Sequence, residues 1–538
     1  MDRENLKKGE GCTTQPSKER ESANLSIQKG SLIVDCTFRD GGYYTDWDFN
    51  GDIVYTYLVG MNNLPIDYIE LGYRNNHEPE YLGKFGYTPV YLLKQIRDLS
   101  KKKLAVMLNE KSTKVEDLEH LTEPIKGLVD MVRLAVDPKN LQRAITLAKA
   151  VKQQGFEVGF NIMYMSKWDE YEGFFDQLSG LNGVVDIMNM VDSFSGIMPD
   201  EVEKIIGKLR QKLTCKIGFH GHNNLQMGLY NTLKAIECGV DSVDATILGM
   251  GRGAGNLNTE LLLTYLNRKG LDVNFNALSD VITAFQPLYE KYRWGTQLPY
   301  MISGANSLPQ KEVMALVANR VYSFDSIVRG LQNKKNKVED NAKYPILEGE
   351  QYDNVIIIGG GESPMNHLEG ITNFIRQSKN IALVFATARH AHNFINLDVP
   401  QYYCLLGREA KRLKANVSAA QFKATCVLPP YPRKLGTDVP DYAEKATYEL
   451  PKIEFTNEYL DSCTTLAIQT ALNICKGNIY IVGYDGYPGS VLSEKEVALS
   501  NENMALLRDY EKYTGKKMMS LTPSLYPELD VESIYQFI

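Results

Sequence analysis

Long apolar runs are absent from this sequence, and no stretch approaches the roughly 18 consecutive apolar residues of a membrane-spanning helix. The N-terminal residues also lack the apolar segment of a signal peptide. Both absences lead us to expect a cytoplasmic protein without membrane contact. The eight cysteines contain no CxxC pair, which in so long a chain favours reduced thiols over disulfides or a structural zinc site.

Runs of basic residues are missing too. The chain has 59 Lys and Arg residues against 66 Asp and Glu residues, a formal net charge of -7. Because no basic surface is available to bind phosphates, nucleic acid is not an expected partner. What is present is typical of a globular protein, since 43% of the residues are hydrophobic and 23% are charged. At roughly 100–200 residues per domain, the 538 residues predict two or three domains.

Short β-rich runs alternate with segments of helical apolar spacing from Ser31 onward, after a polar stretch over residues 1–29 that we expect to be a disordered arm. Such alternation indicates parallel βα units. Eight β-rich runs lie at residues 31–38, 68–73, 104–109, 129–136, 156–164, 185–192, 216–222 and 242–250. Their number and spacing predict a (β/α)8 TIM barrel over residues 30–276.

A second α/β domain is expected after the barrel. Residues 277–345 should form a helical extension and a linker, which ends in the charged segment 333–345. The apolar positions of 277–332 could pack on the barrel or on a second subunit, so a homo-oligomer stays open. A second series of β-rich runs, at 354–364, 381–387, 402–407, 424–430 and 478–486, predicts a smaller Rossmann-like domain over residues 346–538.

Polar residues recur where the predicted barrel strands end. They are Arg39, Asp40, Glu70, Arg74, Asn109, Arg133, Asn161, Asp192, His220 and His222. TIM barrels build their active sites at the carboxyl ends of the strands, so we expect a catalytic barrel in which Glu70, Arg133, Asn161 and Asp192 bind the substrate. The alternative for each single residue is a salt bridge or a helix cap.

Two of the seven histidines, His220 and His222, stand two residues apart at the end of the seventh predicted strand. Residues so spaced share a face of a strand, so both imidazoles could bind one divalent metal at the mouth of the barrel. Asp40, at the end of the first strand, is the natural third ligand. The alternative is a pair of hydrogen-bonded histidines without a metal.

Three motifs carry a resemblance to a known family. Residues 35–41 are Asp-Cys-Thr-Phe-Arg-Asp-Gly, residues 219–224 are Phe-His-Gly-His-Asn-Asn, and residues 249–256 are Gly-Met-Gly-Arg-Gly-Ala-Gly-Asn. Together they resemble the metal-dependent lyase and aldolase barrels, which include hydroxymethylglutaryl-CoA lyase, the isopropylmalate and homocitrate synthases and 4-hydroxy-2-oxovalerate aldolase. The resemblance spans roughly residues 31–330 and is strongest toward the hydroxy-oxovalerate aldolases, notably in residues 228–256 and in Asp192-Ser193.

The resemblance implies roles for individual residues. Asp40, His220 and His222 would hold Mn²⁺ or Mg²⁺, and Asn256 would add or orient a ligand. The metal would chelate the carboxylate and carbonyl oxygens of a 2-oxo acid, and Arg39 would stabilise the charge of the enolate oxygen. The alternative for Arg39 is a structural ion pair with Asp40 or Glu70.

The base that takes the hydroxyl proton is left open. The hydroxy-oxovalerate aldolases place a histidine shortly after the Arg-Asp-Gly motif, whereas this chain continues with Gly42, Tyr43 and Tyr44. Tyr43, Tyr44, His77 or a metal-bound water could serve, and the two tyrosines could instead be aromatic packing over the barrel mouth. Gly42 also stands where the acyl-CoA condensing enzymes continue the motif differently, which argues against an acetyl-CoA-dependent synthase.

Three glycines follow the first predicted strand of the second domain. Gly359, Gly361 and Ser363 could present backbone amides to the phosphate of a nucleotide, and the alternative is a tight turn without a ligand. His390 and His392 form a second His-x-His pair, which we interpret as surface or helix-start residues because no carboxylate motif accompanies it. No activity is assigned to this domain.

The sequence therefore predicts a divalent-metal-dependent aldolase, a carbon–carbon lyase that cleaves or forms a 4-hydroxy-2-oxo acid through a pyruvate-type enolate. Its small-molecule partners would be a 2-oxo acid and an aldehyde. Two alternatives stay open. One is a Claisen-type acyl-CoA condensing synthase on the same barrel, and the other is a barrel that binds a 2-oxo acid without turnover.

Overall fold

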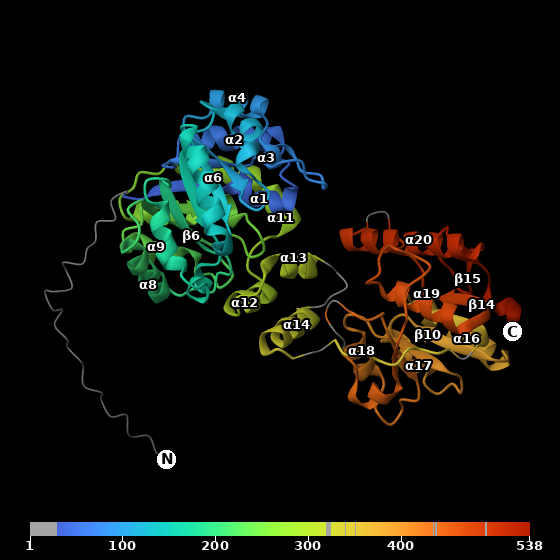
Figure 1. Ribbon diagram of the computed structural model, residues 1–538. Helices are drawn as coiled ribbons and strands as arrows, with labels where there is room; N and C mark the ends of the chain where they lie inside the picture. Colours follow the sequence, from blue (N-terminus) through green and yellow to red (C-terminus); the bar gives the residue numbers. More distant parts are fainter. Residues whose placement is uncertain are drawn as a thin grey trace, which may run out of the picture. The chain divides into compact units, whose positions relative to one another are not determined.

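The protein is described from a computed structural model over residues 30–318, 324–338, 341–349, 351–433, 435, 438–489 and 492–538. The expected disordered arm, residues 1–29, lies outside these described residues. The chain divides into two compact units, Met1–Lys311 and Glu312–Ile538, and Figure 1 colours them from blue to red along the sequence. The division falls within the segment 277–345, where the sequence predicts an extension and a linker.

Eight parallel strands close into a barrel in chain order, and β8 pairs with β1. The strands are β1 (Leu32–Asp35), β2 (Tyr68–Tyr73), β3 (Lys103–Asn109), β4 (Met131–Val136), β5 (Glu157–Ile162), β6 (Ile187–Asp192), β7 (Lys216–Gly221) and β8 (Ser242–Ala245). Each strand lies in one of the eight predicted β-rich runs. The prediction of a TIM barrel is therefore confirmed.

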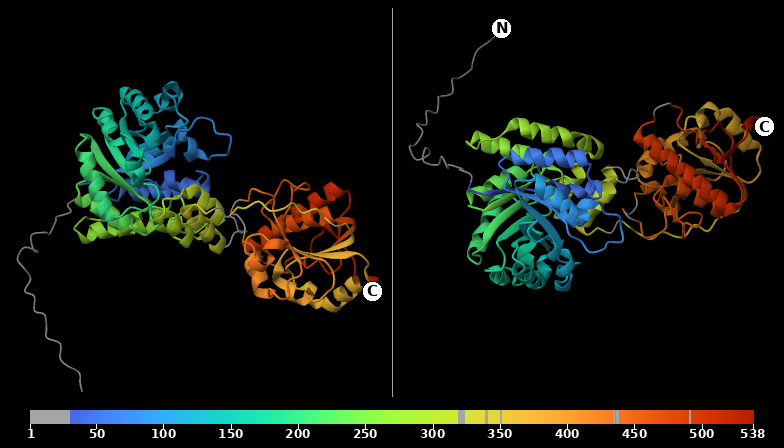
Figure 2. Two further views of the ribbon diagram at one scale, coloured as in Figure 1. Left: turned by 60° about the horizontal axis from the view of Figure 1, so that its bottom comes forward. Right: turned by 90° about the horizontal axis from the view of Figure 1, so that it is seen from above.

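Helices surround the ring of strands, as the two views of Figure 2 show. They are α1 (Thr37–Thr45), α2 (Gly51–Asn62), α3 (Lys84–Tyr87), α4 (Val90–Leu99), α5 (Leu118–Leu121), α6 (Leu141–Gln153), α7 (Phe174–Gln177), α8 (Pro199–Arg210), α9 (Gly228–Glu237), α10 (Thr259–Arg268), α11 (Phe275–Tyr292) and α12 (Leu298–Ala305). Helix α13 (Gln310–Ala318) lies at the division of the units. In the described part of the chain, no helix has the length and apolar character that a membrane crossing requires.

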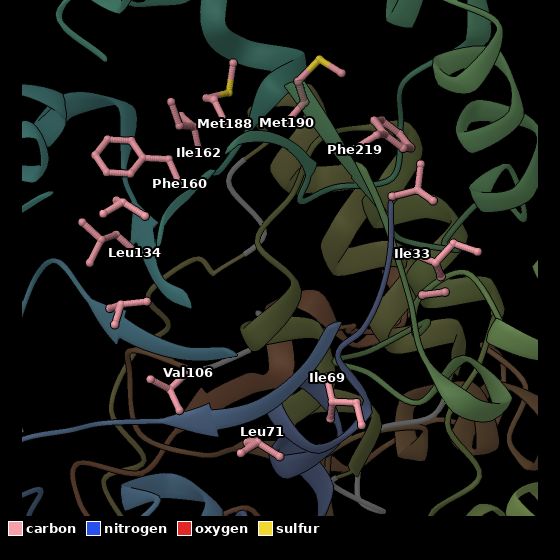
Figure 3. Packing of buried hydrophobic residues seen from close by; sticks show 14 of the residues in the cluster. Ile33, Ile69, Leu71, Val106, Leu134, Phe160, Ile162, Met188, Met190 and Phe219 are labelled. Carbon is pink, nitrogen blue, oxygen red and sulfur yellow. The ribbon is translucent and has the colours of Figure 1, made fainter. Parts of the chain in front are cut away.

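The strands place apolar and polar side chains on opposite faces. In β2, Ile69 and Leu71 belong to the apolar core, and Glu70 between them therefore points to the other face, into the barrel. Figure 3 shows the apolar set around the ring of strands. The labelled members are Ile33, Ile69, Leu71, Val106, Leu134, Phe160, Ile162, Met188, Met190 and Phe219.

The barrel interior is itself divided. A small apolar cluster near the amino ends of the strands contains Val34, Tyr68, Ala105, Met131 and Ile187. Most of these residues stand at or near the first position of their strand. The buried polar residues of the strands come later in each strand, so the interior becomes polar toward the carboxyl ends.

The second unit is an eight-stranded parallel sheet with the order β13-β12-β11-β10-β9-β14-β15-β16. The strands are β9 (Tyr352–Ile358), β10 (Ile381–Phe385), β11 (Gln401–Cys404), β12 (Thr425–Leu428), β13 (Thr447–Glu449), β14 (Cys475–Val482), β15 (Met518–Ser520) and β16 (Leu529–Val531). The strand order reverses between β9 and β14, as in doubly wound folds. The prediction of a second α/β domain is confirmed.

Helices cover both faces of this sheet. They are α14 (Phe324–Asn336), α15 (Ser363–Asn366), α16 (Leu368–Gln377), α17 (Ala391–Phe394), α18 (Glu409–Asn416), α19 (Cys463–Ile474) and α20 (Glu494–Thr514). Val355 and Ile357 belong to one core with residues of α19 and α20, whereas Ile356 and Ile358 belong to a second core with residues of α16, α17 and α18. Strand β9 is therefore buried on both faces.

Helix α11 packs against α2 on the outside of the barrel, and a glycine permits the close approach. A Cβ added at Gly60 of α2 would lie 2.2 Å from Cγ2 of Val281 in α11. Gly51, at the start of the same helix, has open space around its Cα. A side chain at Gly60 would therefore clash with α11, whereas a side chain at Gly51 would not clash with any residue.

Gly60→Ala should lower the free energy of unfolding by about 1–3 kcal/mol, because the new methyl group pushes α11 away from α2. Gly51→Ala is the matched control, and it should leave the stability unchanged or raise it by up to about 1 kcal/mol. Urea denaturation followed by circular dichroism measures both changes. Equal effects of the two substitutions would contradict the packing of α11 on α2.

Candidate functional site

His220 and His222 lie side by side at the carboxyl end of β7. Their ring centroids are 4.9 Å apart, and both side chains are buried. Nδ1 of His222 donates to the backbone oxygen of Asp192 at 2.9 Å, which leaves Nε2 as the atom with a lone pair in the neutral ring. Burial and the neighbouring His220 lower the pKa of His222 to about 3. His222 is therefore neutral, which is the form that binds a metal.

Asp40 and Asn256 face the two histidines. Asp40 stands in the first turn of α1, and its Oδ2 lies 3.4 Å from Nε2 of His220. Asn256 donates from Nδ2 to the same carboxylate oxygen at 2.7 Å, and its backbone pairs with His222. Within the described chain, Oδ1 of Asn256 is buried and accepts no hydrogen bond. The four predicted metal ligands are thus brought together, with one buried oxygen lacking a donor.

A closed ring of buried side chains lies beneath this site. Its members, in order of contact, are Asp40, Arg39, Glu70, Arg133, Asp244 and His220. Nε of Arg39 donates to Oε2 of Glu70 at 2.9 Å, while Nη1 donates to Asp40. We call these six residues the buried charge ring. They come from α1, β2, β4, β8 and β7, so the ring ties distant segments of the barrel together.

The other half of the ring passes through β4 and β8. Nη1 of Arg133 donates to Oε2 of Glu70 at 3.1 Å, and Nη2 donates to Oδ2 of Asp244 at 2.7 Å. The same Asp244 oxygen lies 2.8 Å from Nδ1 of His220. Asp244 therefore fixes both the orientation of the His220 ring and which of its nitrogens faces Asp40.

The ring contains three carboxyl groups, two guanidinium groups and one imidazole. Burial alone would raise the pKa of Asp40, but Arg39 and the two histidines bring it below its usual value. Burial also opposes ionisation of Asp244, yet Arg133 and His220 lower its pKa to about 2. Charged groups in the barrel interior are costly unless they are paired, as these carboxylates are.

Two sets of donor atoms could hold a metal ion here. One is the predicted set of Asp40, His220, His222 and Asn256, and the other is Cys36, His220 and Asp244, whose ligand atoms lie within 4.8 Å of one another. In the second set, Asp244 already accepts from Arg133 and His220. Burial and the nearby Asp244 raise the pKa of the Cys36 thiol well above its usual value, which disfavours the thiolate that binds metals.

The first donor set fits a divalent ion better. It offers a carboxylate with a lowered pKa, the Nε2 atom of a neutral histidine and the orphaned oxygen of Asn256. Nitrogen and oxygen donors of this kind accept Mn²⁺ or Mg²⁺. A cation at this place would also lie beside the Asp40 carboxylate, whose pKa is below its usual value.

Asn161 and Asp192 end the neighbouring strands β5 and β6 and are both buried. Oδ1 of Asn161 accepts from Nδ2 of Asn189 at 3.3 Å, so the two amides support each other inside the barrel. Burial raises the pKa of Asp192 to about 7, although hydrogen bonds from the backbone amides of residues 195–197 act to lower it. Through its backbone oxygen, Asp192 also holds His222 in place.

The two tyrosines of α1 have different surroundings. Tyr44 donates from its hydroxyl to the backbone oxygen of Gly253 at 3.0 Å, and burial raises its pKa. Tyr43 is 37% exposed, and its hydroxyl lies 3.5 Å from that of Tyr73. The third side chain considered as a base, His77, lies exposed on the loop after β2. Tyr44 is thus committed to packing, whereas Tyr43 stays accessible.

The backbone amides of the glycine turn in the second unit already donate to other groups of the protein. The amide of Ser363 donates to Oδ2 of Asp485 at 2.9 Å, and the amides of Gly359 and Gly361 donate to backbone oxygens of Val482 and Gly483. A Cβ at Gly361 would lie 2.5 Å from the Asp485 carboxylate. This carboxylate takes the place that a phosphate would need, so the geometry favours the tight turn, and the nucleotide stays a prediction.

His390 begins helix α17 and is buried, with its Nε2 2.8 Å from the backbone oxygen of Gly361. Its neighbour Arg389 donates to the backbone oxygen of Gly360 and pairs with Glu362. Both side chains therefore brace the glycine turn. This arrangement agrees with the interpretation of His390 as a helix-start residue.

Comparison with known proteins places the barrel in a family. The model of the HMGL-like family matches residues 31–284. The 4-hydroxy-2-oxovalerate aldolase of Chloroflexus aurantiacus is 30% identical over 256 residues, which cover 47% of this chain and 73% of that enzyme. The chain belongs to the HMGL-like family. The resemblance inferred from the three motifs is thereby confirmed, and membership supports an enzyme of the lyase or aldolase class.

Two further relatives extend this comparison. The oxaloacetate decarboxylase of Mycobacterium tuberculosis is 24% identical over 312 residues, covering 55% of this chain and 90% of that enzyme. The crystal structure of the N-terminal domain of a proposed aldolase from Bacteroides vulgatus is 60% identical, with a TM-score of 0.53, and covers 55% of this chain and 99% of that domain. Family members of different named activities thus share this barrel.

The two donor sets predict opposite effects of two substitutions. His222→Ala should weaken Mn²⁺ binding by at least about 10-fold if Asp40, His220, His222 and Asn256 are the ligands, whereas Cys36→Ser should change it by less than about 3-fold. Isothermal titration of the metal-free protein with Mn²⁺ measures both affinities, and circular dichroism checks the fold of each variant. The reverse pattern would identify the set that contains Cys36 and Asp244.

Proposed function

We propose that the barrel is a divalent-metal-dependent aldolase that cleaves or forms a 4-hydroxy-2-oxo acid through a pyruvate-type enolate. The observation that carries this proposal is the convergence of Asp40, His220 and His222 at one end of the barrel, where the buried charge ring holds Asp40 and His220 in place. A bound Mn²⁺ or Mg²⁺ would act as a Lewis acid toward the oxygens of a 2-oxo acid. This chain's own residues would position the acid and move its protons.

Arg39 is the residue that we assign to the enolate oxygen. Its Nε is held by Glu70 and its Nη1 by Asp40, so the guanidinium is fixed next to the metal ligands. Among residues 30–318, its Nη2 has no hydrogen-bond acceptor. A guanidinium fixed in this way can stabilise a developing negative charge without rearranging. The ion pairs of Arg39 therefore serve to orient it and leave one donor for the substrate.

Glu70 and Arg133 receive a different role from the one expected. Both side chains are almost fully buried, and each is paired on two sides within the ring. We therefore propose that they position Arg39 and His220 in place of binding substrate. Asn161 and Asp192, which end β5 and β6, stay our proposals for substrate contact.

We propose that Tyr43 accepts the proton of the substrate's hydroxyl group in the cleavage direction. In the cleavage direction this hydroxyl loses its proton, the carbon–carbon bond next to it breaks, and the electron pair of that bond forms the enolate. Tyr44 is unsuited because its hydroxyl is used by Gly253 and its pKa is raised by burial. Tyr43 keeps an accessible hydroxyl, which lies beside that of Tyr73.

The named relatives share enolate chemistry, but they do not share one substrate. Decarboxylation of oxaloacetate and cleavage of 4-hydroxy-2-oxovalerate both leave the enolate of pyruvate. Relatives of this chain carry both names. An oxaloacetate decarboxylase is therefore the second candidate function, and it would use the same ligands and the same Arg39. The cytoplasmic location and the homo-oligomer stay predictions.

Exchange of deuterium into the methyl group of pyruvate tests the proposal, because it requires enolisation and no aldehyde. The Mn²⁺-loaded protein should catalyse the exchange, and EDTA treatment should abolish it. Arg39→Lys should slow it by roughly 100-fold, since the single ammonium nitrogen of lysine lacks the planar fork that contacts Glu70, Asp40 and a substrate through separate nitrogens. Arg268→Lys, an exposed position on α10, is the control. NMR follows the loss of the methyl signal.

Absence of exchange with metal bound would contradict the proposal. A barrel that binds a 2-oxo acid without turnover would then give no exchange in any variant, and a condensing synthase would give none in pyruvate but would consume an acyl-CoA together with a 2-oxo acid. Release of CO₂ from oxaloacetate, measured beside cleavage of 4-hydroxy-2-oxovalerate, distinguishes the decarboxylase from the aldolase.

A further inference from the structure

Arg252 is a cation at the mouth of the barrel that has no carboxylate partner in residues 30–318. It belongs to the loop between β8 and α10, and its side chain is half-buried. The one described contact of this side chain is with the face of Tyr43, whose ring centroid lies 5.6 Å from Cζ of Arg252. A guanidinium in such a place has donors available for an anion.

The loop that carries Arg252 is fixed on both sides. The backbone oxygen of Gly253 accepts from Tyr44, and that of Gly255 accepts from the amide of Asn223 at 2.9 Å. Asn256 at the end of the loop donates to Asp40. The backbone at Arg252 is therefore set by the same residues that form the candidate metal site, and the side chain begins from a defined position.

The contacts of Arg252 place it on the substrate side of the site. Tyr43 is the accessible tyrosine of α1, and Arg252 lies over its ring. Its neighbour Gly251 lies against the side chain of Asn256, because a Cβ added at Gly251 would lie 2.8 Å from Cγ of Asn256. Arg252 is thus near the donor atoms without contacting a carboxylate that would neutralise it.

The other arginines of this region already have acidic or backbone partners. Arg39 and Arg133 are paired within the buried charge ring. Arg74 is buried and donates to the backbone oxygens of Leu121, Tyr87, Thr88 and His120. Arg252 alone among these four has neither an acidic partner nor a backbone acceptor in the described part of the barrel. The guanidinium of Arg252 is therefore a positive charge near the metal ligands that no described acidic residue of the barrel pairs with.

We propose that Arg252 is a specificity-determining residue that binds a carboxylate or phosphate group on the aldehyde partner. The inference rests on the proposed aldolase function and narrows it to aldehydes that carry a negative charge. In the bond-forming direction the enolate carbon attacks the aldehyde carbon and the aldehyde oxygen takes a proton, while Arg252 holds the anionic end. The shared chemistry of the ligand is a terminal oxyanion, which the planar guanidinium binds with two parallel hydrogen bonds.

The test compares kcat/KM for three aldehydes condensed with pyruvate by the Mn²⁺-loaded full chain. Succinic semialdehyde carries a carboxylate, glyceraldehyde 3-phosphate carries a phosphate, and butyraldehyde is neutral. The ratio of the anionic to the neutral value should fall roughly 10- to 100-fold in Arg252→Gln, as expected for the loss of a charged hydrogen-bond donor. Arg252→Lys should keep part of the ratio. The preferred anion in the wild type distinguishes carboxylate from phosphate.

The matched control is Arg268→Gln, which removes the same charge from the exposed face of α10 and should leave the ratio unchanged. An equal fall with all three aldehydes in Arg252→Gln would overturn the proposal, because Arg252 would then act on the pyruvate half. A ratio that does not change would overturn it as well. Circular dichroism of each variant shows whether the fold is retained.

A binding measurement separates this inference from the proposed function. Isothermal titration of the Mn²⁺-loaded protein with succinate reports the anion site without turnover, and Arg252→Gln should weaken the affinity by roughly 10-fold or more. If pyruvate shows no exchange and no aldehyde reacts, the proposed function fails, and loss of succinate binding in Arg252→Gln still supports an anion site. If exchange occurs and succinate binding is the same in both proteins, the inference about Arg252 fails alone.

Discussion

The constraint on which the rest of this barrel depends is the ring of paired charged and polar side chains in its interior. Removing one member of such a ring leaves a buried charge without its partner, which typically costs about 3–5 kcal/mol. The ring joins α1 to four strands that are far apart in the sequence, and Arg133 and Asp244 are separated by 111 positions. It therefore sets the orientation of Arg39, Asp40 and His220 at once. The lowered pKa of the Asp40 carboxyl also makes a cation the natural ligand beside the two histidines.

The ring divides the barrel into layers with different tasks. Near the amino ends of the strands, a small apolar cluster that includes Val34 and Met131 closes the interior. Above it lie the paired charges, and above these the donors of His222 and Asn256 face the mouth. Each layer restrains the next, because Asp244 orients His220 and the backbone oxygen of Asp192 orients His222. A site built in this way is rigid before any ligand binds, as preorganised catalysis requires.

Sequence patterns predict the parts of this arrangement that depend on local spacing. The eight β-rich runs predict the barrel, and the spacing of His220 and His222 places both imidazoles on one face. The partners of Glu70 and Arg133 are not predictable in this way, because ion pairs across a barrel leave no local pattern. Asp244 is not among the predicted site residues. The pattern that could have indicated it is a single acidic residue within the apolar run 242–250. In the second unit, β13, β15 and β16 have three residues each, which is too few to show alternation.

The central claim is that the ring presents Asp40, His220 and His222 to one divalent ion. Anomalous diffraction from a crystal of the Mn²⁺-loaded protein, collected at the manganese absorption edge, tests it most directly. The account predicts a single strong peak within coordination distance of the Asp40 carboxylate and of Nε2 of both histidines. A peak between Cys36 and Asp244, or no peak in the barrel at saturating Mn²⁺, would contradict it.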